Sequence, residues 1–572
     1  MKEKSALGPE AQGSDLAGTR NSTTLFSMRA IRYGILALQA LAPSVGLLAH
    51  SETALAQVTF SISDQESEAT SREPGLRIRL IAGDTGRTIP GCVRIRVAGN
   101  PPGSWLRLDP LLPRGLGLER TVQDLGWYVL TEEAEIPVPE SRFEIEAYSG
   151  IRFERRVLEM VPNPMGQDRL NIALQPLFDP VAEGWVAGNT HLHLRRIDRE
   201  LADRYLVDVS RAEGLEMVFV SYLERAVEDL EYISNTYQPI DLERLSTSHL
   251  VFGPGEEYRH NFRSGDERYG HVMFLNLAPP ILPASIGPGI TKQGRDNIPL
   301  RPAVVRARDL EATIVWCHGQ FGLEDIPSWL DGLIDAMNIF DGRVRGTYEE
   351  TYYQYLNLGL KVPFSTGTDW FINDHSRVYV RMDGEHRSDQ EQWLAGLRRG
   401  ETFITNGAWL EFSVDRASPG DEIALEQSET VNIRGRAVSR HDFGTLEVVH
   451  NGAVIHSVPA SRRQDGPGFD ARITDWSVRV DRPGWIALRI QPAPETLTEM
   501  GRPLFGHTSP VYLRYGGNLS SDPEAARHLV RELKRSQDVI REEGVFSDTS
   551  ELESILAIYE TALSRLINSG SP

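Results

Sequence analysis

Two histidines stand one residue apart in the segment GNTHLHLRRID, residues 188–198, and an aspartate follows them. The residues before the pair are largely apolar, so we expect His191 and His193 to lie on a β-strand. Side chains alternate along a strand, and both imidazoles therefore face the same side. Such a pair suits two ligands of one cation at about 2.0–2.1 Å each. Ordinary surface or core histidines give the same pattern, so the pair indicates a metal site only together with further ligands.

Later segments place more ligand-type side chains at the ends of predicted strands. Glu257 lies in GPGEEYRH, and His271 opens the next strand. His318 ends the apolar run TIVWC, where an imidazole without a partner is costly, and Asp369 follows the last predicted strand, VPFSTG. Each has an ordinary alternative: a solvated acid for Glu257, a hydrogen-bonded core residue for His318 and a helix N-cap for Asp369. Their coincidence in one region predicts a shared site.

The region that carries these residues, 184–408, alternates strand-like apolar runs with helical stretches. This alternation predicts a parallel α/β domain, in which sites gather at the C-terminal ends of the strands. We expect one helix from about Asp198 to Ala212, with Gly214 at its end.

The flanking regions show the period of two that is typical of strands. Residues 57–180 and 409–517 each combine short alternating runs with Gly and Pro turns, which predicts a β-sandwich on either side. Asn451-Gly452 predicts a tight hairpin turn in the second sandwich. Residues 518–572 predict a hairpin of two amphipathic helices, packed on a domain or on a dimer partner.

The N-terminal segment has the features of a secretory signal. Arg29 and Arg32 precede the apolar run 33–48, and Ala-Leu-Ala ends at Ala56. The run is short and contains Pro43, which counts against a membrane anchor. We therefore expect residues 1–56 to be a leader and signal peptide, and the mature chain to be periplasmic or secreted by a bacterium.

Charge and cysteine content exclude some classes of partner. The formal net charge is −20 and there is no Lys/Arg tract, which argues against a nucleic-acid partner. Cys92 and Cys317 are the two cysteines. We expect two buried free thiols rather than a disulfide framework.

The ordered series His-x-His, Glu, His, His, Asp resembles the ligand series of the PHP superfamily of metal-dependent hydrolases. Within it, the chain resembles the CehA/McbA-type branch, which includes carbaryl hydrolases. The segments ETFITNG (401–407) and GHTSPVYL (506–513) resemble further signatures of that branch. Over residues 184–406 the resemblance implies a distorted (β/α)7 barrel with metals at the strand C-termini. With its flanking β-sandwiches and helical hairpin, the chain is expected to be of the α/β class.

The resemblance also implies how the ligands divide between ions, and it predicts a two-metal centre bridged by Glu257. Zn and Mn both suit such ligands. The first ion would be held by His191, His193, Glu257 and Asp369, and the second by Glu257, His271 and His318.

The family's third ion uses the aspartate of the first motif and two further histidines. The matching positions here are Asp198, Leu223 and Phe371, so both histidines are missing. The losses are confined to this third site, as expected of a working two-metal enzyme rather than a decayed one. Asp198 is then expected to be a helix N-cap or an ion-pair partner.

These features predict an exported hydrolase of an ester, carbamate or phosphoester bond in a small molecule. Two bound ions would activate water, with Asp369 as the acceptor of its proton. His375 is the candidate proton donor, although exposed loop histidines are common. Candidate pocket residues are Tyr222, Arg259, His260 and Trp370, with His507 approaching from the C-terminal region; His249, His386, His450, His456 and His528 are expected to be ordinary histidines.

The alternative is a non-catalytic periplasmic or cell-surface binding protein that keeps the barrel and its metals. Nucleophilic Ser-His-Asp catalysis is less favoured, because no Gly-x-Ser-x-Gly motif lies between a strand and a helix. No stable membrane span is expected after processing, and the tail helices leave a homo-oligomer open.

Overall fold

The computed structural model describes residues 75–162, 168–224, 232–260, 269–286, 299–318, 322–343, 347–382, 387–517, 519, 522–544, 546 and 548–569. The expected leader and signal peptide, residues 1–56, and His386 lie outside these ranges. From Ser71 onward the chain forms one compact unit. Within the described ranges, the helices are all too short or too polar to cross a membrane.

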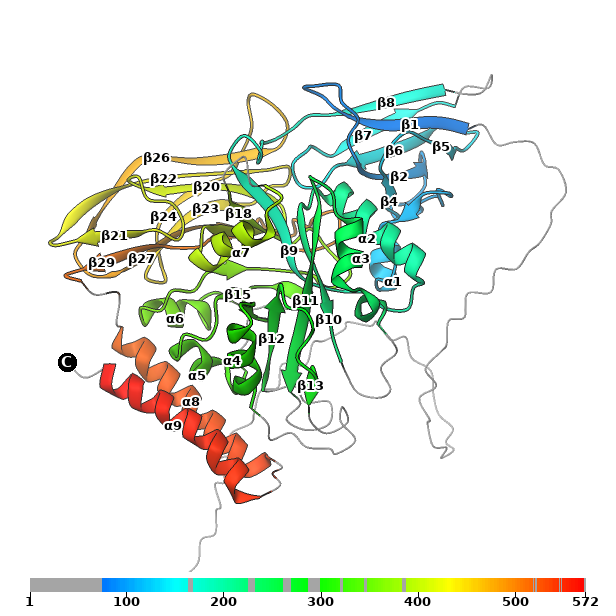
Figure 1. Ribbon diagram of the computed structural model, residues 1–572. Helices are drawn as coiled ribbons and strands as arrows, with labels where there is room; N and C mark the ends of the chain where they lie inside the picture. Colours follow the sequence, from blue (N-terminus) through cyan, green and yellow to red (C-terminus); the bar gives the residue numbers. More distant parts are fainter. Residues whose placement is uncertain are drawn as a thin grey trace, which may run out of the picture. The chain divides into compact units, whose positions relative to one another are not determined.

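The α/β region is built around β9 (Trp185–His193), which is buried along almost its whole length. On one side β9 pairs in parallel with β10, and on the other it pairs with β17 and, antiparallel, with β18. Beyond β10 the strand order is β11, β12, β14, β15, β16, in a sheet that curls into a barrel-like arrangement (Figure 1). The strands are β10 (Met217–Tyr222), β11 (Val251–His260), β12 (Gly270–Leu275), β13 (Ser285–Ile286), β14 (Thr313–Trp316), β15 (Ala336–Asn338), β16 (Phe364–Ser365), β17 (Asp369–Trp370), β18 (Arg377–Arg381) and β19 (Thr402–Thr405).

This sheet is mixed, whereas the alternating pattern predicted a parallel one. β12 runs antiparallel to both of its neighbours, β11 and β14. The connection from His260 to Gly270 is shorter than the dozen or so residues that a parallel crossover needs. Because β11 and β12 are antiparallel, the start of β12 lies at the same sheet edge as the end of β11.

Helices follow several of these strands. α2 (Arg199–Glu213) begins at Asp198, whose side chain accepts a hydrogen bond from the Leu201 N–H at 2.8 Å, and ends at Gly214 with φ 68°. The predicted N-cap role of Asp198 and the helix end at Gly214 are both confirmed. The other helices before the tail are α1 (Arg120–Gln123), α3 (Pro239–Leu245), α4 (Arg301–Asp309), α5 (Asp325–Leu330), α6 (Tyr352–Asn357) and α7 (Gln390–Arg399).

Residues 75–174 form two sheets that share one apolar core, the arrangement of a sandwich. One sheet has three strands and the other has five. The first contains β1 (Gly75–Ala82), β5 (Ala134–Pro137) and β8 (Asp168–Leu174); the second contains β2 (Gly91–Val97), β3 (Leu112–Pro113), β4 (Tyr128–Leu130), β6 (Phe143–Tyr148) and β7 (Arg156–Met160).

The region after residue 407 is also built of strands in two layers. Asn451 and Gly452 have φ of 50° and 85°, so the predicted tight turn between β23 and β24 is confirmed. β28 pairs with β19, so a backbone ladder joins this region to the α/β region. The strands are β20 (Ala408–Val414), β22 (Glu429–Ser439), β25 (Ser461–Arg462) and β26 (Phe469–Val480) in one sheet, and β21 (Glu422–Leu425), β23 (Thr445–His450), β24 (Ala453–Pro459), β27 (Gly484–Gln491), β28 (Gly506–Thr508) and β29 (Val511–Tyr515) in the other.

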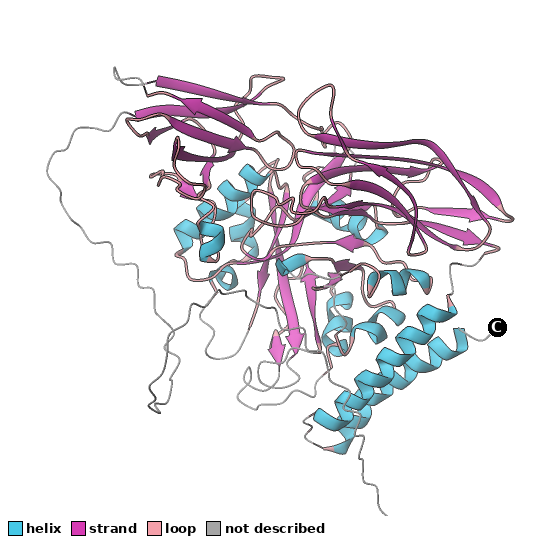
Figure 2. Ribbon diagram, turned by 180° about the vertical axis from the view of Figure 1, so that it is seen from behind, coloured by secondary structure: helices cyan, strands magenta, loops and turns pink. Residues whose placement is uncertain are grey.

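The tail forms a hairpin of α8 (Pro523–Glu543) and α9 (Thr549–Ser569), which lie side by side (Figure 2). Their apolar faces, with Leu529 and Tyr559 among them, join the core of the α/β region. The Tyr559 hydroxyl donates a hydrogen bond to the Leu323 carbonyl. The hairpin therefore packs on the same chain's α/β region.

Candidate metal centre

The histidine pair ends β9, at the C-terminal edge of the curled sheet. His191 and His193 are fully buried, and their rings meet edge to face on one side of the strand. β17 lies beside this end of β9, with Asp369 opposite Leu192 and Trp370 opposite His193. The strand pairing thus brings Asp369 to the histidines from far along the chain.

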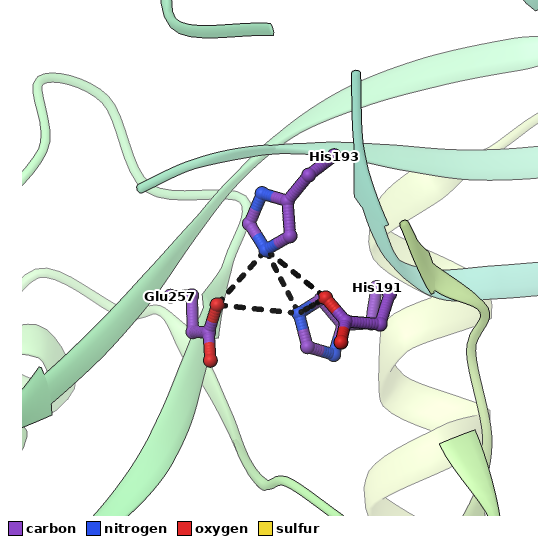
Figure 3. A group of neighbouring side chains, drawn as sticks. His191, His193 and Glu257 are labelled. Atoms are coloured by element: carbon purple, nitrogen blue, oxygen red, sulfur yellow. Dashed lines mark hydrogen bonds and ion pairs between the residues drawn. The ribbon is translucent and has the colours of Figure 1, made fainter. Parts of the chain in front are cut away.

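Four ligand-type side chains converge at this point: His191, His193, Glu257 and Asp369. The two histidine Nε2 atoms are 2.9 Å apart, and Glu257 Oε2 lies 2.9 Å from His193 Nε2 (Figure 3). Asp369 Oδ1 lies 3.5 and 3.8 Å from Nε2 of His191 and His193. Ligands held at about 2.0–2.1 Å around a tetrahedral zinc are about 3.3 Å apart. The group therefore has the size of a single-cation site.

The second ring nitrogen of each histidine has a partner of its own. Nδ1 of His193 lies 2.9 Å from the Ser221 carbonyl oxygen, and Nδ1 of His191 lies 2.9 Å from Asp341 Oδ2. Both Nδ1 atoms must donate, which in neutral imidazoles leaves two Nε2 lone pairs facing each other at 2.9 Å. Such lone pairs repel unless a proton or a metal cation lies between them. The donor set therefore fits a metal ion.

A second group surrounds the other oxygen of Glu257. Oε1 of Glu257 lies 2.8 Å from His271 Nδ1 and 3.7 Å from His318 Nε2. Glu257 therefore presents one oxygen to each group, as a bridging ligand would. The antiparallel start of β12 supplies His271, and the end of β14 supplies His318. All six residues that the sequence suggested as metal ligands meet here.

Asp341 is the functional residue that the sequence reasoning missed. It is fully buried, and its Oδ2 and Oδ1 accept hydrogen bonds from Nδ1 of His191 and of His318, at 2.9 and 3.0 Å. One carboxylate thus orients a histidine of each group, in the way that second-layer carboxylates fix metal-binding imidazoles. The available signal was its position just after the strand MNIF, where the other ligands also follow strands.

The candidate ligands differ in protonation. Burial lowers the pKa of His191 and His318, but neighbouring groups, Asp341 and Asp369 among them, outweigh it and raise both values well above 6.5. These two imidazoles must therefore lose a proton to bind a cation.

Glu257 and His271 are already in the binding form. Burial raises the pKa of Glu257, but hydrogen bonds from His191, His193 and His271 outweigh it and hold the pKa well below its usual value. Burial lowers the pKa of His271 to about 4, so its imidazole is neutral. An ionised carboxylate and a neutral imidazole are the forms that bind a cation.

Two of the ligands have strained backbones. His318 and Asp369 have φ of 64° and 58°, in the left-handed region that residues other than glycine rarely adopt. Each such conformation costs roughly 1–3 kcal/mol, and such strain gathers at functional sites. The surrounding packing therefore holds these two side chains in place against a local cost.

Cys317 lies beside His191 and Asp341 in a third group of ligand-type atoms. Burial raises the pKa of its thiol to about 11, so it is protonated. Cys317 and Cys92 are both free and buried, which confirms the prediction of two free thiols. Because both Asp341 oxygens are engaged by histidines, this group supports the ligands and is less suited to hold an ion.

The three positions that the sequence resemblance assigned to a third ion have structural roles here. Leu223 is 1% exposed, and its backbone N–H and carbonyl are hydrogen-bonded to the Asn235 side chain. The fully buried Phe371 ring lies edge to face on Tyr205 and close to Gly117. With Asp198 engaged as an N-cap, these three positions have taken up structural roles.

An aromatic wall adjoins the first group. The Trp370 ring lies 5.1 Å from that of His193 and 5.1 Å from that of Tyr232, with the Arg195 guanidinium 4.8 Å from its centroid. Trp370 is half-buried, as a residue beside an open site would be.

The other three expected pocket residues have different surroundings. Arg259 is buried and faces His271 across the β11–β12 pair. The Tyr222 hydroxyl donates to Glu224 at 3.2 Å. The side chain of His260 lies outside the described part of the structure.

His375, the candidate proton donor, is buried, so the alternative of an ordinary exposed loop histidine is wrong. It is 1% exposed, with Nδ1 at 2.7 Å from Glu213 Oε2 and Nε2 at 3.3 Å from Glu499 Oε2. Its ring meets Tyr148 edge to face. Among the described residues, its ring nitrogens face Glu213 and Glu499, and neither of these carboxylates is a candidate metal ligand. This placement does not favour a role as proton donor.

His507 is also enclosed. Its Nδ1 donates to the Thr508 carbonyl at 2.7 Å, and its Nε2 accepts from the Tyr353 hydroxyl at 2.7 Å. Burial lowers its pKa to about 3. It therefore holds strands and an aromatic cluster together. Four further histidines were expected to have no role in the site. They lie outside the three groups of possible metal ligands: His249, His450, His456 and His528.

A scan against protein-family models, a search of curated proteins and a search of solved structures each found no match.

Proposed function

We propose that this protein is a hydrolase that uses two divalent metal ions to cleave an ester, carbamate or phosphoester bond in a small molecule. The observation that carries the proposal is the convergence of four ligand-type side chains, with Nε2 of His191 and of His193 2.9 Å apart and both Nδ1 atoms facing oxygen acceptors. A metal cation bound by both Nε2 atoms would replace the proton that otherwise lies between them.

The division of the ligands supports two ions rather than one. Glu257 offers Oε2 to the histidine pair and Oε1 to His271 and His318. Bridged ions about 3.5–4 Å apart are the arrangement used in hydrolytic two-metal sites. Imidazole and carboxylate ligands suit Zn and Mn alike.

When bound, two such ions would bring the pKa of a coordinated water towards 7 and stabilise negative charge that develops on the substrate. Within the chain, Asp369 is the carboxylate on the open side of the group, with its side chain 15% exposed. Asp369 is thus placed to accept a proton from an attacking water. Asp341 holds the tautomers of His191 and His318, and Trp370 bounds the space next to His193.

The order of the ligands supports a relation to the CehA/McbA-type branch of the PHP superfamily, with its distorted (β/α)7 barrel. The mixed sheet, with β12 antiparallel, would be a departure within that fold. Export to the periplasm or the medium belongs to the same proposal and rests on the sequence of residues 28–56.

Metal analysis of the purified protein, together with turnover of p-nitrophenyl esters, phosphoesters and aryl carbamates, tests the proposal. We expect about two ions per chain, and loss of turnover by about 10³-fold or more in His193→Ala and Glu257→Gln. His249→Ala, a change of an exposed histidine, is the matched control and should retain both metal and activity.

Two results would contradict the proposal in different ways. Full metal loading without turnover on any of the three substrate classes would favour the binding-protein alternative. Loading near one ion per chain would contradict the bridged pair.

A further inference from the structure

A cleft of about 450 Å³ lies between the α/β region and the sheet β20–β22–β26. Its lining includes Trp185 and Arg381 on one side and Phe412, Arg434 and Arg436 on the other. Trp185 begins β9 and His193 ends it. At about 3.3 Å per residue these ends are roughly 26 Å apart, so the cleft is separate from the metal centre.

The lining is rich in guanidinium groups although the whole chain is acidic. Four arginines, Arg381, Arg434, Arg436 and Arg472, face three acidic side chains in the cleft, in a chain with net charge −20. Such a concentration of positive charge in an acidic protein favours an anionic ligand over a neutral or cationic one.

Two of these arginines oppose each other directly. Arg436 on β22 is the register partner of Arg472 on β26. Like charges in directly opposite positions of an antiparallel pair repel and are destabilising. Glu411 and Asp470 pair with these arginines and relieve part of the repulsion, and an anion lying over both guanidiniums would relieve the rest.

Acidic neighbours orient the guanidiniums and leave donors free. Arg436 donates to Glu411 at 2.8 Å, and Arg434 donates to Asp475 at 3.1 Å. Arg472 donates to Asp470 at 3.3 Å. Each guanidinium has five N–H groups, so one carboxylate contact leaves several for a ligand. Across the cleft, the described contact of the Arg381 guanidinium is with the Ser418 hydroxyl, a neutral acceptor, at 2.9 Å.

The backbone is irregular at the same place. The register of β22 with β26 shifts between Ile433 and Gly435, and Asp475, on the bulged stretch of β26, has φ 50°. Bulges re-aim side chains and occur often beside binding sites. Here the bulge directs the Arg434–Asp475 pair to the cleft.

We propose that this cleft binds a small molecule that carries at least two negative charges on phosphate or carboxylate groups. Arg381, Arg436 and Arg472 would bind its oxygens, since planar guanidiniums suit both groups. Trp185 and Phe412 would contact its apolar part. A volume of about 450 Å³ is in the range of small-molecule sites.

Calorimetric titration of the full, metal-loaded chain with inorganic phosphate, succinate and acetate tests this site. We expect the two multiply charged anions to bind at least 10-fold more tightly than acetate. Arg381→Ala and Arg472→Ala should each weaken that binding about 10-fold or more. Arg472→Lys keeps the charge but loses the planar fork, so a smaller loss is expected.

Two controls distinguish binding in the cleft from binding elsewhere on the protein. Arg479→Ala removes an exposed charge from the same strand outside the cleft and should change the affinity by less than about 2-fold. His193→Ala should leave binding unchanged if the anions occupy the cleft, whereas anions bound at the metal centre would be lost.

Thermal unfolding gives a second measurement that does not depend on calorimetry. Without ligand, Arg472→Ala should melt close to the wild type, because the exposed Arg472–Asp470 ion pair contributes little to stability. Its melting temperature should no longer rise with added phosphate. Equal affinity in the wild type and the Arg381→Ala and Arg472→Ala variants, equal binding of acetate, or an equal loss in Arg479→Ala would overturn the proposal.

Discussion

The metal centre and a second cluster of buried histidine and carboxylate groups differ in how their charges are satisfied. The second cluster, here called the buried ion network, consists of Arg114, Glu213, His375, Arg377, Arg440 and Glu499. In it, each nitrogen of His375 faces a carboxylate, and arginines neutralise the remaining charge. In the metal centre, two imidazole nitrogens instead face each other.

This difference separates the buried ion network from the candidate metal centre, although both contain buried histidines and carboxylates. The charges of the network are paired within the chain, and it joins the N-terminal strands, the α/β region and the C-terminal strands through Arg114, Glu213 and Glu499. The metal centre has donors without a matching cation. What the ring nitrogens face therefore distinguishes a metal site from a structural ion network better than the presence of histidines does.

Chelation is expected to have the largest effect, and to act on the metal centre alone. Removal of metal with EDTA should reduce turnover about 10³-fold or more and lower the melting temperature, since a ligand at 1,000 times its Kd adds about 4 kcal/mol. Zn or Mn should restore both. Activity assays and thermal melts before and after metal addition measure this, and activity that survives exhaustive dialysis would contradict the two-metal proposal.

In contrast to chelation, Glu213→Gln should cause a large loss of stability and no loss of bound metal. Glu213 and Arg114 are both fully buried, and Glu213 also accepts from His375 and Arg377. Removal of one partner from a buried ion pair costs about 3–5 kcal/mol. Urea unfolding would measure the loss, and metal content is the control. A fall in bound metal would show that the two clusters are coupled.

Asp341→Asn tests the link between the two groups of the metal centre. Asp341 accepts from His191 and from His318, so its loss should weaken both ions. Changes at such supporting carboxylates typically cost 10–100-fold in metal affinity or activity. Competition with a metal-binding dye would measure it. Unchanged affinity for both ions would mean that the hydrogen bonds from Asp341 do not orient the two histidines for metal binding.

The pH dependence of stability should distinguish the buried ion network from the rest of the molecule. Burial lowers the pKa of His375, but Glu213 and Glu499 outweigh this and raise it above 6.5. A raised pKa contributes stability that is fully present below pH 6.5 and is lost as the pH rises through the folded value. The stability gap between wild type and His375→Asn should therefore be widest near pH 6 and narrow above it. Urea unfolding between pH 6 and 9 measures the gap, and a gap that widens with pH would contradict this placement of charge.

The sequence predicted local features well where one residue determines them. Asp198 and Gly214 bound a helix because a carboxylate can cap N–H groups and glycine tolerates positive φ. Asn451-Gly452 turns a hairpin for a similar reason. The grouping of the six ligands could also be anticipated, since strand ends meet at one edge of a sheet.

Features that depend on tertiary pairing could not be predicted in this way. The direction of β12 depends on the length of a connection, which an alternating pattern of apolar runs does not reveal. The sequence offered His375 as a proton donor or as an exposed loop histidine, and only the fold encloses it between Glu213 and Glu499. Asp341 lies near the ligands in space but has no motif of its own.

Asp198→Ala should have the smallest effect, and it tests whether a third ion is bound. The Asp198 carboxylate accepts from the Leu201 N–H at 2.8 Å, and loss of such a cap costs about 1 kcal/mol. Metal content should stay at about two per chain, because Leu223 and Phe371 offer no ligand atoms at the matching positions. Urea unfolding and metal analysis on the same preparation measure both quantities. A loss of bound metal with unchanged stability would make Asp198 a ligand, and the division between structural and metal-binding carboxylates would then have to be redrawn at the start of α2.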